Sequence, residues 1–391
     1  MLFINENNLA THAPRLAATG LLAFLYYAFI RAIYKVYFHP LSKIPGPRTC
    51  SSFLKTQPAL APAFTPRAPR AQEPVLHRYV SLLVERLREA ITRNGAKAQA
   101  DIDMAPWFNF TTFDIFGDLG FGESFNCLEN SRYHLWVALL FNSVKAASFV
   151  ATVRFYPLLE WLLMKCIPPS LKKMQRKHFD QIVDKVHQRL NWELERPNIM
   201  SHVIGGKQVL DIGVINATFM VLTTAGSKTT ATVLNGTLNY LVNNPDKLEL
   251  LNREIRQYFQ SEDEITLDAL RGFKYLTACL NEGLRLCVPV PWMLLRLVPQ
   301  GGATVCGEWL PGGTPIQPFS TGPRNCLGQY LAWAEMRLIL AKLVWNFDIR
   351  VVPDKRLRWE DLRTFLLVKK KPIVVEMTLS LVNPWPPQRG L

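Results

Sequence analysis

The stretch Phe319-Ser-Thr-Gly322-Pro-Arg324-Asn-Cys326-Leu-Gly328 decides the fold of this chain, and an apolar helical pattern over Gln329–Val344 follows it directly. A cysteine just ahead of a helix start lies near the partial positive charge of the helix N-terminus. The glycines allow backbone amides to turn toward the sulfur, and Arg324 adds a positive charge. These features favour a thiolate at Cys326, and thiolates bind soft metals and haem iron.

The pattern of the remaining chain is mainly helical. Apolar residues repeat at helical spacing from Val75 onward, and the segment 210–242 is apolar on several sides, so we expect it to pass through the middle of the protein. After residue 286, short apolar runs alternate with glycine and proline, which predicts small hairpins. With no internal repeat, the pattern predicts one mainly α domain with a minor β part. Besides these, helices are expected at 111–119, 131–150, 157–165, 170–196 and 246–260.

The composition bounds the class of protein. The chain has 391 residues, of which 49% are hydrophobic and 19% are charged, so it contains enough apolar material to fold. Its net charge of +14 favours a negatively charged partner, which can be nucleic acid, anionic lipid or an acidic protein. The basic residues are dispersed and not interleaved with aromatic residues, which argues against nucleic acid. None of the seven cysteines lies in C-x-x-C spacing, so neither a zinc finger nor a disulfide framework is predicted.

The N-terminal part of the chain is expected to anchor it in a membrane. After a tail over 1–15, an anchor helix over 16–34 begins with fifteen uncharged residues, which extend about 22 Å in a hydrocarbon core roughly 30 Å thick. If Arg31 snorkels, the helix spans a thin bilayer, and a buried globular helix or a cleaved signal peptide are the alternatives. Basic residues after the apolar run place the rest of the chain in the cytoplasm. A proline-rich hinge and irregular join over 35–74 is expected to lead into a catalytic domain over 75–391.

Two further motifs precede the cysteine loop. Glu282 and Arg285 are separated by one helical turn, so their side chains can meet on one face, although a solvated surface pair is the ordinary explanation of such spacing. Gly226 and Thr229 lie inside the long apolar helix. A mid-helix glycine costs up to about 1 kcal/mol relative to alanine, so the missing side chain makes room for a ligand or for a packed helix.

Together the motifs resemble those of the cytochrome P450 family. The pattern F-x-x-G-x-R-x-C-x-G is similar to the haem-binding loop of that family, E-x-x-R to its buried ion pair, and the Gly-then-Thr arrangement to its oxygen-binding groove. The resemblance implies an axial ligand to haem iron at Cys326, proton delivery at Thr229 beside Gly226, and a structural ion pair of Glu282 with Arg285. It further implies haem contacts from Arg296, Phe319, Gly322, Arg324 and Gly328, with the two arginines facing the propionates.

The resemblance also implies a fold, a function and a location. It predicts a P450-like helical haem-thiolate fold and a monooxygenase of fungal type, which inserts oxygen from O₂ into an apolar small molecule, in a secondary-metabolite pathway. The implied cofactor is haem b, iron protoporphyrin IX, with electrons from NADPH through a cytochrome P450 reductase whose acidic surface suits the positive chain. The Ile44-Pro-Gly-Pro47 segment is similar to the hinge of microsomal members. A single-pass protein of the endoplasmic reticulum membrane, with a cytoplasmic catalytic domain, is therefore expected.

The chain departs from the family pattern at three places. Lys228 stands where an acidic residue usually precedes the threonine, and an ammonium group cannot accept a proton as a carboxylate does. Neither W-x-x-x-R nor a substitute occurs over 48–75. Cys326 follows Arg285 by 41 positions, and the P-E-R-F-like segment expected between them is absent, which indicates a deletion near 316–318. The fold is thus expected to be incomplete, and the alternative function is a non-catalytic remnant, or a mis-spliced gene product, without turnover.

Overall fold

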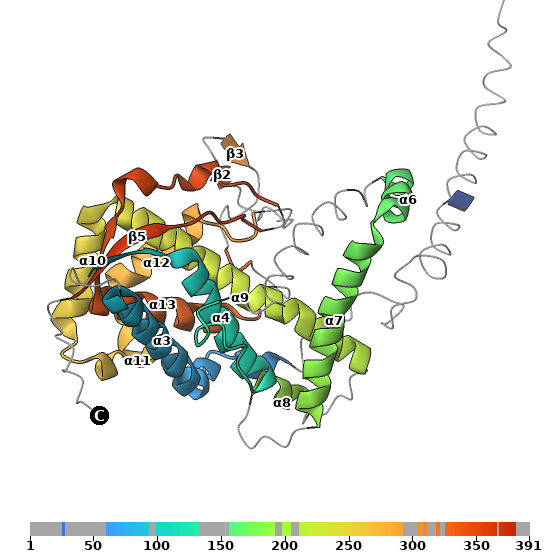
Figure 1. Ribbon diagram of the computed structural model, residues 1–391, viewed down its shortest axis with the longest axis horizontal. Coiled ribbons are helices and arrows are strands. Elements are labelled where there is room, and N and C mark those ends of the chain that lie inside the picture. The colour runs from blue at the N-terminus through green and yellow to red at the C-terminus, as the bar shows by residue number, and fades with distance from the viewer. Residues whose placement is uncertain are drawn as a thin grey trace, which may run out of the picture.

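The computed structural model places most of the chain in one helical body (Figure 1). It describes residues 26–27, 60–93, 99–132, 153, 156–191, 198–204, 211–291, 303–305, 308–310, 318–320, 325–365 and 367–380. The helices of eight or more residues are α3 (Ala68–Arg93), α4 (Met104–Phe121), α6 (Pro157–Cys166), α7 (Pro169–Leu190), α9 (Ile212–Asn243), α10 (Pro245–Tyr258), α12 (Lys274–Leu286) and α13 (Gln329–Asn346). The short helices include Ala61–Phe64 (η3), Ile199–Ile204 (α8), Glu262–Glu264 (η4), Leu267–Leu270 (α11), Pro353–Lys355 (η5) and Trp359–Asp361 (η6).

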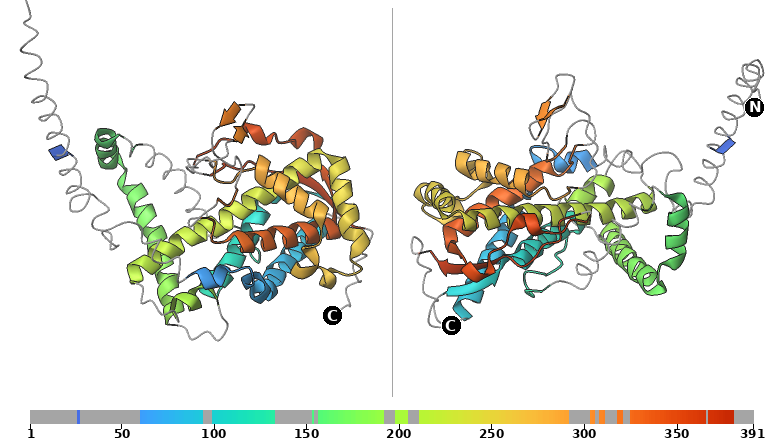
Figure 2. Two further views of the ribbon diagram at one scale, coloured as in Figure 1. Left: turned by 180° about the vertical axis from the view of Figure 1, so that it is seen from behind. Right: turned by 90° about the horizontal axis from the view of Figure 1, so that it is seen from above.

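Helix α9 passes through the middle of the molecule, as its apolar sequence predicted. It packs along α4 and also contacts α7, α12 and α13, so few of its faces reach solvent (Figure 2). Its first turn is capped by Asp211, whose carboxylate accepts a hydrogen bond from the amide of Gly213 at 3.0 Å. The helix ends at Asn243, and α10 begins at Pro245, which agrees with the stop and start expected there.

The β structure is small and lies in two pieces. Strands β1 (Gln99–Asp103), β5 (Val374–Leu379) and β4 (Phe347–Val351) form an antiparallel sheet in that order. Strands β2 (Ala303–Val305) and β3 (Glu308–Leu310) form the hairpin expected from the glycine- and proline-rich sequence. The mainly α class with a minor β part is therefore confirmed.

Helix α13 is fixed in the core by charged side chains at its C-terminal half. Arg256 of α10 donates to the carbonyl oxygens of Val344 and Phe347, both at 2.8 Å, and to the carboxylate of Asp348 at 2.6 Å. The buried ammonium group of Lys342 lies 3.0 Å from the carboxylate of Glu262. These contacts matter for the site because α13 starts directly after the cysteine loop.

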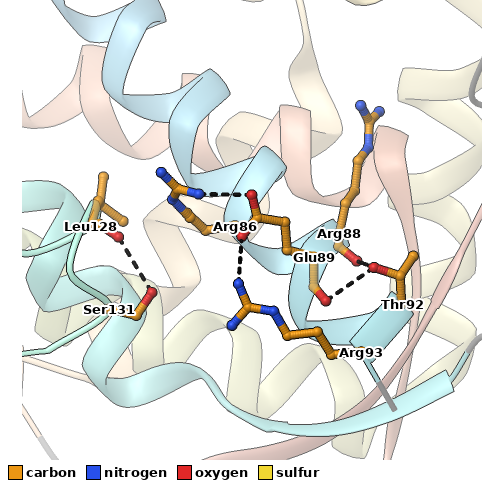
Figure 3. A network of polar contacts seen from close by, with 7 residues as sticks. All are labelled: Arg86, Arg88, Glu89, Thr92, Arg93, Leu128 and Ser131. Carbon is orange, nitrogen blue, oxygen red and sulfur yellow. Dashed lines mark hydrogen bonds and ion pairs between the residues drawn. The ribbon is translucent and has the colours of Figure 1, made fainter. Parts of the chain in front are cut away.

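The end of α3 carries the polar groups expected on the solvent side of an amphipathic helix (Figure 3). Glu89 accepts from Arg86 at 2.7 Å and from Arg93 at 3.1 Å. The hydroxyl of Thr92 donates to the carbonyl oxygens of Arg88 and Glu89. The opposite face of α3 is buried against α4 and α13.

The irregular join predicted to reach Pro74 is wrong in its last residues. Helix α3 begins at Ala68, and Pro74 lies inside it. Tertiary contacts explain the early start, because Gln72 donates to the carbonyl oxygen of Ala63 and Glu73 accepts from the amide of Leu267. Those bonds stabilise the first turns although Pro74 itself cannot donate a backbone bond.

Other expectations fall largely outside the described residues. The helix predicted at 131–150 lies there almost entirely, as do the tail over 1–15 and most of the join over 35–74. Of the anchor over 16–34, only Tyr26 and Tyr27 are described, and both are helical and exposed. None of the helices in the described ranges combines the length and apolar character that a membrane span needs.

Candidate functional site

The predicted ligand Cys326 lies directly before α13. Its backbone amide donates a 2.7 Å hydrogen bond to the carbonyl oxygen of Phe319, which closes the loop between the two residues. The ring of Phe319 lies 6.3 Å from that of Trp333 on α13, so the start of the loop is packed against the helix that follows it. Gly328 is the N-cap residue of α13. The sequence therefore placed Cys326 and its helix correctly.

Cys326 differs in exposure from Cys127, Cys279 and Cys287. Cys127 and Cys287 are buried and Cys279 is half-buried, whereas Cys326 is exposed. The amide of Gly328 donates a hydrogen bond to its sulfur, which lowers the pKa of the thiol, but the surrounding protein raises this pKa by a larger amount. Arg324, the cation of the motif, lies outside the described residues, and its effect on the sulfur stays a prediction.

Three of the predicted haem contacts are not placed. Arg296, Gly322 and Arg324 lie outside the described residues, and their roles stay predictions. Within the described ranges there is no group of three or more histidine, cysteine or acidic side chains that could bind a metal ion. The role of Cys326 as the axial ligand of haem iron, which needs one protein thiolate, stays a prediction.

Helix α9 has an open stripe in an otherwise buried segment. Val221 is 49% exposed, Ala225 is exposed and Thr229 is partly exposed, and their spacing of four residues places them on one face. On either side, Leu222 and Ser227 are buried. An open stripe in the central helix is a surface on which a flat apolar ligand can lie.

The predicted oxygen-groove residues take different places on α9. Thr229 lies on the open stripe, where its hydroxyl donates to the carbonyl oxygen of Ala225 at 2.6 Å. Gly226 faces α4 instead, because a Cβ atom there would lie 3.0 Å from the ring of Phe116. Close packing against α4 therefore explains why a glycine occurs at position 226, and the role of Gly226 toward bound oxygen stays a prediction.

A buried carboxyl group that the sequence reasoning missed lies beside this segment. Glu335 of α13 is 3% exposed, and its carboxyl accepts a hydrogen bond from the hydroxyl of Thr230. Its Oε2 atom has no hydrogen-bond partner. Burial raises the pKa of Glu335 to about 8, and the bond from Thr230 opposes this shift. In the sequence, an acidic residue within the apolar run of α13 could have indicated a buried carboxyl group.

The Glu282–Arg285 contact is formed as predicted, but it is open to solvent. Arg285 donates to both carboxylate oxygens of Glu282, at 2.8 and 2.5 Å. The hydrogen bonds from Arg285 lower the pKa of Glu282. The side chains are 51% and 54% exposed, and a groove of about 350 Å³ between α9 and α12 lies beside them.

Tight packing holds this ion-pair helix against α9. A Cβ atom on Gly283, which lies between the two charged residues in sequence, would lie 1.9 Å from the hydroxyl oxygen of Thr237. Glycine is required there because the helices approach so closely. The groove beside the pair is lined by Thr237, Tyr240, Tyr275, Cys279, Glu282 and Gly283, among others.

The described residues fit a haem group in the chemistry that they offer. Cys326 supplies an exposed sulfur with an amide donor, which is the donor set that haem-thiolate ligation uses. The open face of α9 supplies an apolar wall through Val221 and Ala225. Helix α13, which starts after Cys326, contacts α9, so the two features belong to one packed unit.

Comparisons with known proteins point in the same direction. A profile of the cytochrome P450 family matches residues 54–317 and 313–377. The two matched segments meet at 313–317, next to the place where a deletion is predicted. In fold, the chain resembles the crystal structure of a cytochrome P450 with a TM-score of 0.66 and 17% sequence identity, covering 90% of this chain and 83% of the other.

The similar curated proteins are fungal enzymes. Cytochrome P450 monooxygenase lcsI of Purpureocillium lilacinum is 38% identical over 81% of this chain and 69% of its own length. Cytochrome P450 monooxygenase FUM2 of Gibberella moniliformis is 38% identical over 81% of this chain and 76% of its own. Averantin hydroxylase of Dothistroma septosporum is 36% identical over 76% of this chain and 63% of its own length.

Replacement of Glu335 by glutamine tests the buried carboxyl group. Because the pKa of Glu335 is raised in the folded state, the folded chain binds more protons than the unfolded chain between about pH 4.5 and 8, so this group lowers stability as pH rises through that window. Glu335→Gln should raise the thermal unfolding midpoint by about 2–4 °C at the upper end of the window and leave it unchanged at the lower end. Glu249→Gln, at an exposed site on α10, is the control. An equal change at both ends of the window would contradict the assignment.

Proposed function

The chain belongs to the cytochrome P450 family and is a cytochrome P450 monooxygenase by its similarity to curated relatives, and from this premise we propose that it oxidises an apolar small molecule in fungal secondary metabolism. In the balanced reaction, O₂, two electrons and two protons convert a C–H bond to C–OH and release water. Haem b, when bound, supplies the reductive activation of O₂. The similarity covers about four-fifths of the chain with relatives named as monooxygenases, which favours the enzyme over the inactive remnant.

The observation that carries the proposal is the exposed sulfur of Cys326 at the start of α13. As the iron ligand, Cys326 would be ionised, and the amide of Gly328 would stabilise the sulfur's negative charge. The apolar side chains of the α9 stripe would contact the porphyrin or the substrate and exclude water. Thr229, on the same stripe, would position a proton donor through its hydroxyl.

Replacement of Cys326 by alanine tests the proposal. The full chain, expressed with a haem supply, should give the red-shifted Soret band of thiolate-ligated haem after reduction and addition of CO. Cys326→Ala should abolish this band, whereas Cys279→Ala should retain it, because Cys279 is a half-buried residue of α12 and not part of the loop. A wild-type chain that folds but shows no such band would favour the inactive remnant.

We propose that an NADPH–cytochrome P450 reductase docks at a groove beside the cysteine loop. The groove has a volume of about 360 Å³ and contains two guanidinium groups, those of Arg271 and Arg337. Arg337 lies 4.8 Å from the centre of the Trp333 ring, and its Nε atom is buried without a hydrogen-bond partner. Burial, followed by the charge of Arg271, lowers the pKa of Arg337, and a carboxylate on an acidic partner would offset the repulsion between the two guanidinium groups.

The position of the groove supports an electron donor as its occupant. It is built on the first turns of α13, which begins three residues after Cys326, so a protein bound there would be close to the iron. Asp268 already forms ion pairs with Arg70 and Arg271 and is itself half exposed. The remaining positive charge fits an acidic docking surface.

Removal of the two arginine charges tests this docking site. The double variant Arg271→Gln/Arg337→Gln should slow reduction of the haem by reductase about tenfold at low salt and weaken the dependence of the rate on ionic strength. Reduction by dithionite should be unchanged, because it needs no docked protein. The exposed Arg253 of α10 offers the control Arg253→Gln. An unchanged reductase rate in the double variant would contradict the proposed site.

We propose that the chain lies on the cytoplasmic side of the endoplasmic reticulum membrane through an anchor over 16–34 and through α6. On α6, Leu158 is 82% exposed, and Trp161 and Leu162 are each 52% exposed. The ammonium group of Lys165 lies 4.0 Å from the centre of the Trp161 ring. In Figure 1, α6 lies at one edge of the molecule, away from the sheet. Exposed apolar and aromatic side chains beside lysine are typical of a membrane interface.

An environment-sensitive label at α6 tests the membrane proposal. The full chain carrying Leu158→Cys should show a shielded, blue-shifted label after reconstitution into vesicles. A label at Tyr258→Cys, which is exposed on α10, should remain accessible to water-soluble quenchers. Fractionation of cells should recover the chain with endoplasmic reticulum membranes. Equal quenching at both sites, or recovery in the soluble fraction, would contradict the proposal.

A further inference from the structure

A groove between α9, α10 and α12 has the size of a small-molecule site and lies apart from the open stripe of α9. Its volume of about 350 Å³ falls within the range of about 300–1,000 Å³ that such sites have. Thr237, which lines the groove, follows Thr229 by eight residues, or about 12 Å along the axis of α9. In both Figure 1 and Figure 2, α10 and α12 lie on the side of the molecule away from α6. The groove is therefore separate from the stripe and from the proposed membrane contact.

The hydroxyl group of Thr237 is left without a partner in this groove. The other six threonines of α9 each donate to the carbonyl oxygen four residues earlier. They are Thr218, Thr223, Thr224, Thr229, Thr230 and Thr232. Thr237 is 2% exposed, and among the described residues its Oγ1 atom has no hydrogen-bond partner. The atom lies against Gly283, which also lines the groove, so a ligand that pairs with this hydroxyl would supply a bond that the chain does not.

The walls of the groove are held in place by bonds outside it. The phenol hydroxyl of Tyr240 donates to the carboxylate of Glu360 at 2.5 Å, which fixes one aromatic wall. The carboxylate of Glu254 on α10 accepts from the amides of Tyr275 and Leu276 at 2.9 and 2.8 Å. Those two bonds fix the first turn of α12, which carries the second aromatic wall. A preformed site avoids much of the cost of ordering side chains when a ligand binds.

The charges at the rim favour a neutral ligand. The ammonium group of Lys247 lies 2.9 Å from the carboxylate of Asp246, and the guanidinium group of Arg285 is bonded to Glu282. Each of these cations has an anion of the chain beside it, so a charged ligand would gain little from either pair. The rest of the lining is mainly apolar and includes the two tyrosine rings.

The apolar part of the groove is recessed, which favours a small molecule over a protein partner. None of the described large hydrophobic residues that are exposed lines the groove. Its own Tyr240, Leu241, Tyr275 and Leu286 are half-buried or buried. A stable protein interface buries about 800 Å² on each partner around an apolar centre. Here the apolar side chains lie inside the groove instead, where a ligand of a few rings can reach them.

We propose that this groove binds a neutral aromatic molecule that carries a hydroxyl group. The hydroxyl oxygen of the ligand accepts a hydrogen bond from Thr237, and its rings pack between Tyr240 and Tyr275. The site does not involve Cys326 or the open stripe of α9, so it goes beyond the proposed monooxygenase activity and does not depend on bound haem.

Two ligands that differ by one hydroxyl group test the role of Thr237. In equilibrium dialysis of the full chain, Thr237→Val should weaken the binding of 2-naphthol about fivefold and leave the binding of naphthalene unchanged, because valine keeps the shape of the side chain without its donor. Thr237→Ser, which keeps the hydroxyl, should bind 2-naphthol like the wild type. Equal effects of Thr237→Val on both ligands would overturn the assignment of the hydroxyl group.

A charged analogue tests the class of ligand. The wild type should bind 2-naphthoate more weakly than 2-naphthol, because each cation at the rim already has an anion beside it. Tighter binding of 2-naphthoate would overturn the assignment of a neutral ligand.

Filling the groove tests its location. Ala278 is an exposed groove residue of α12, so Ala278→Trp should weaken the binding of 2-naphthol about tenfold or more. Asn281→Trp, which is exposed on the same helix but outside the groove, is the matched control and should bind like the wild type. Equal binding by the two variants would overturn the proposal. A wild-type dimer that Ala278→Trp separates in size-exclusion chromatography would also overturn it, because a second copy would then fill the groove. A missing haem spectrum would affect only the proposed function.

Discussion

The rest of the candidate site depends on the junction between the cysteine loop and α13. The bond from the Cys326 amide to the Phe319 carbonyl closes the loop, and the Gly328 amide reaches the sulfur at the helix start. This geometry is useful only if α13 does not move, which is why the contacts of Arg256 and Lys342 at its other end matter. A helix buried on most sides and bonded through its charged residues can hold a single ligand atom in place.

Sequence patterns predicted this junction because its requirements are local. The loop and the start of α13 are encoded within ten consecutive residues, and the same holds for the end of α9 at Asn243 and the start of α10 at Pro245. The early start of α3 could not be read locally, since it rests on bonds from Gln72 to Ala63 and from Leu267 to Glu73. Glu335 was missed for the same reason, because only tertiary packing places its carboxyl against Thr230.

The glycine at position 226 had two possible explanations from the sequence, and the structure supports one of them. From the sequence, a glycine before a threonine in a buried helix makes room either for a ligand or for another helix. The structure supplies the second reason, because a Cβ atom at position 226 would lie only 3.0 Å from the ring of Phe116. Thr229, three residues later, points to the open stripe instead. The motif therefore combines a packing position and a ligand-facing position, and their spacing of one helical turn keeps both on α9.

The charges around α9 change what the missing acidic residue means for proton handling. Lys228 is buried on α9 and Lys370 donates a hydrogen bond to Asn109 on α4, whereas the carboxyl of Glu335, on α13, accepts from Thr230. Because burial disfavours the charged form of each group, it pushes the lysines and the glutamate toward neutrality from opposite directions. Lys228 on α9 and Glu335 against Thr230 thus have pKa values displaced to about 8 from opposite sides, and burial rather than an acidic residue at position 228 sets the charge of this part of α9.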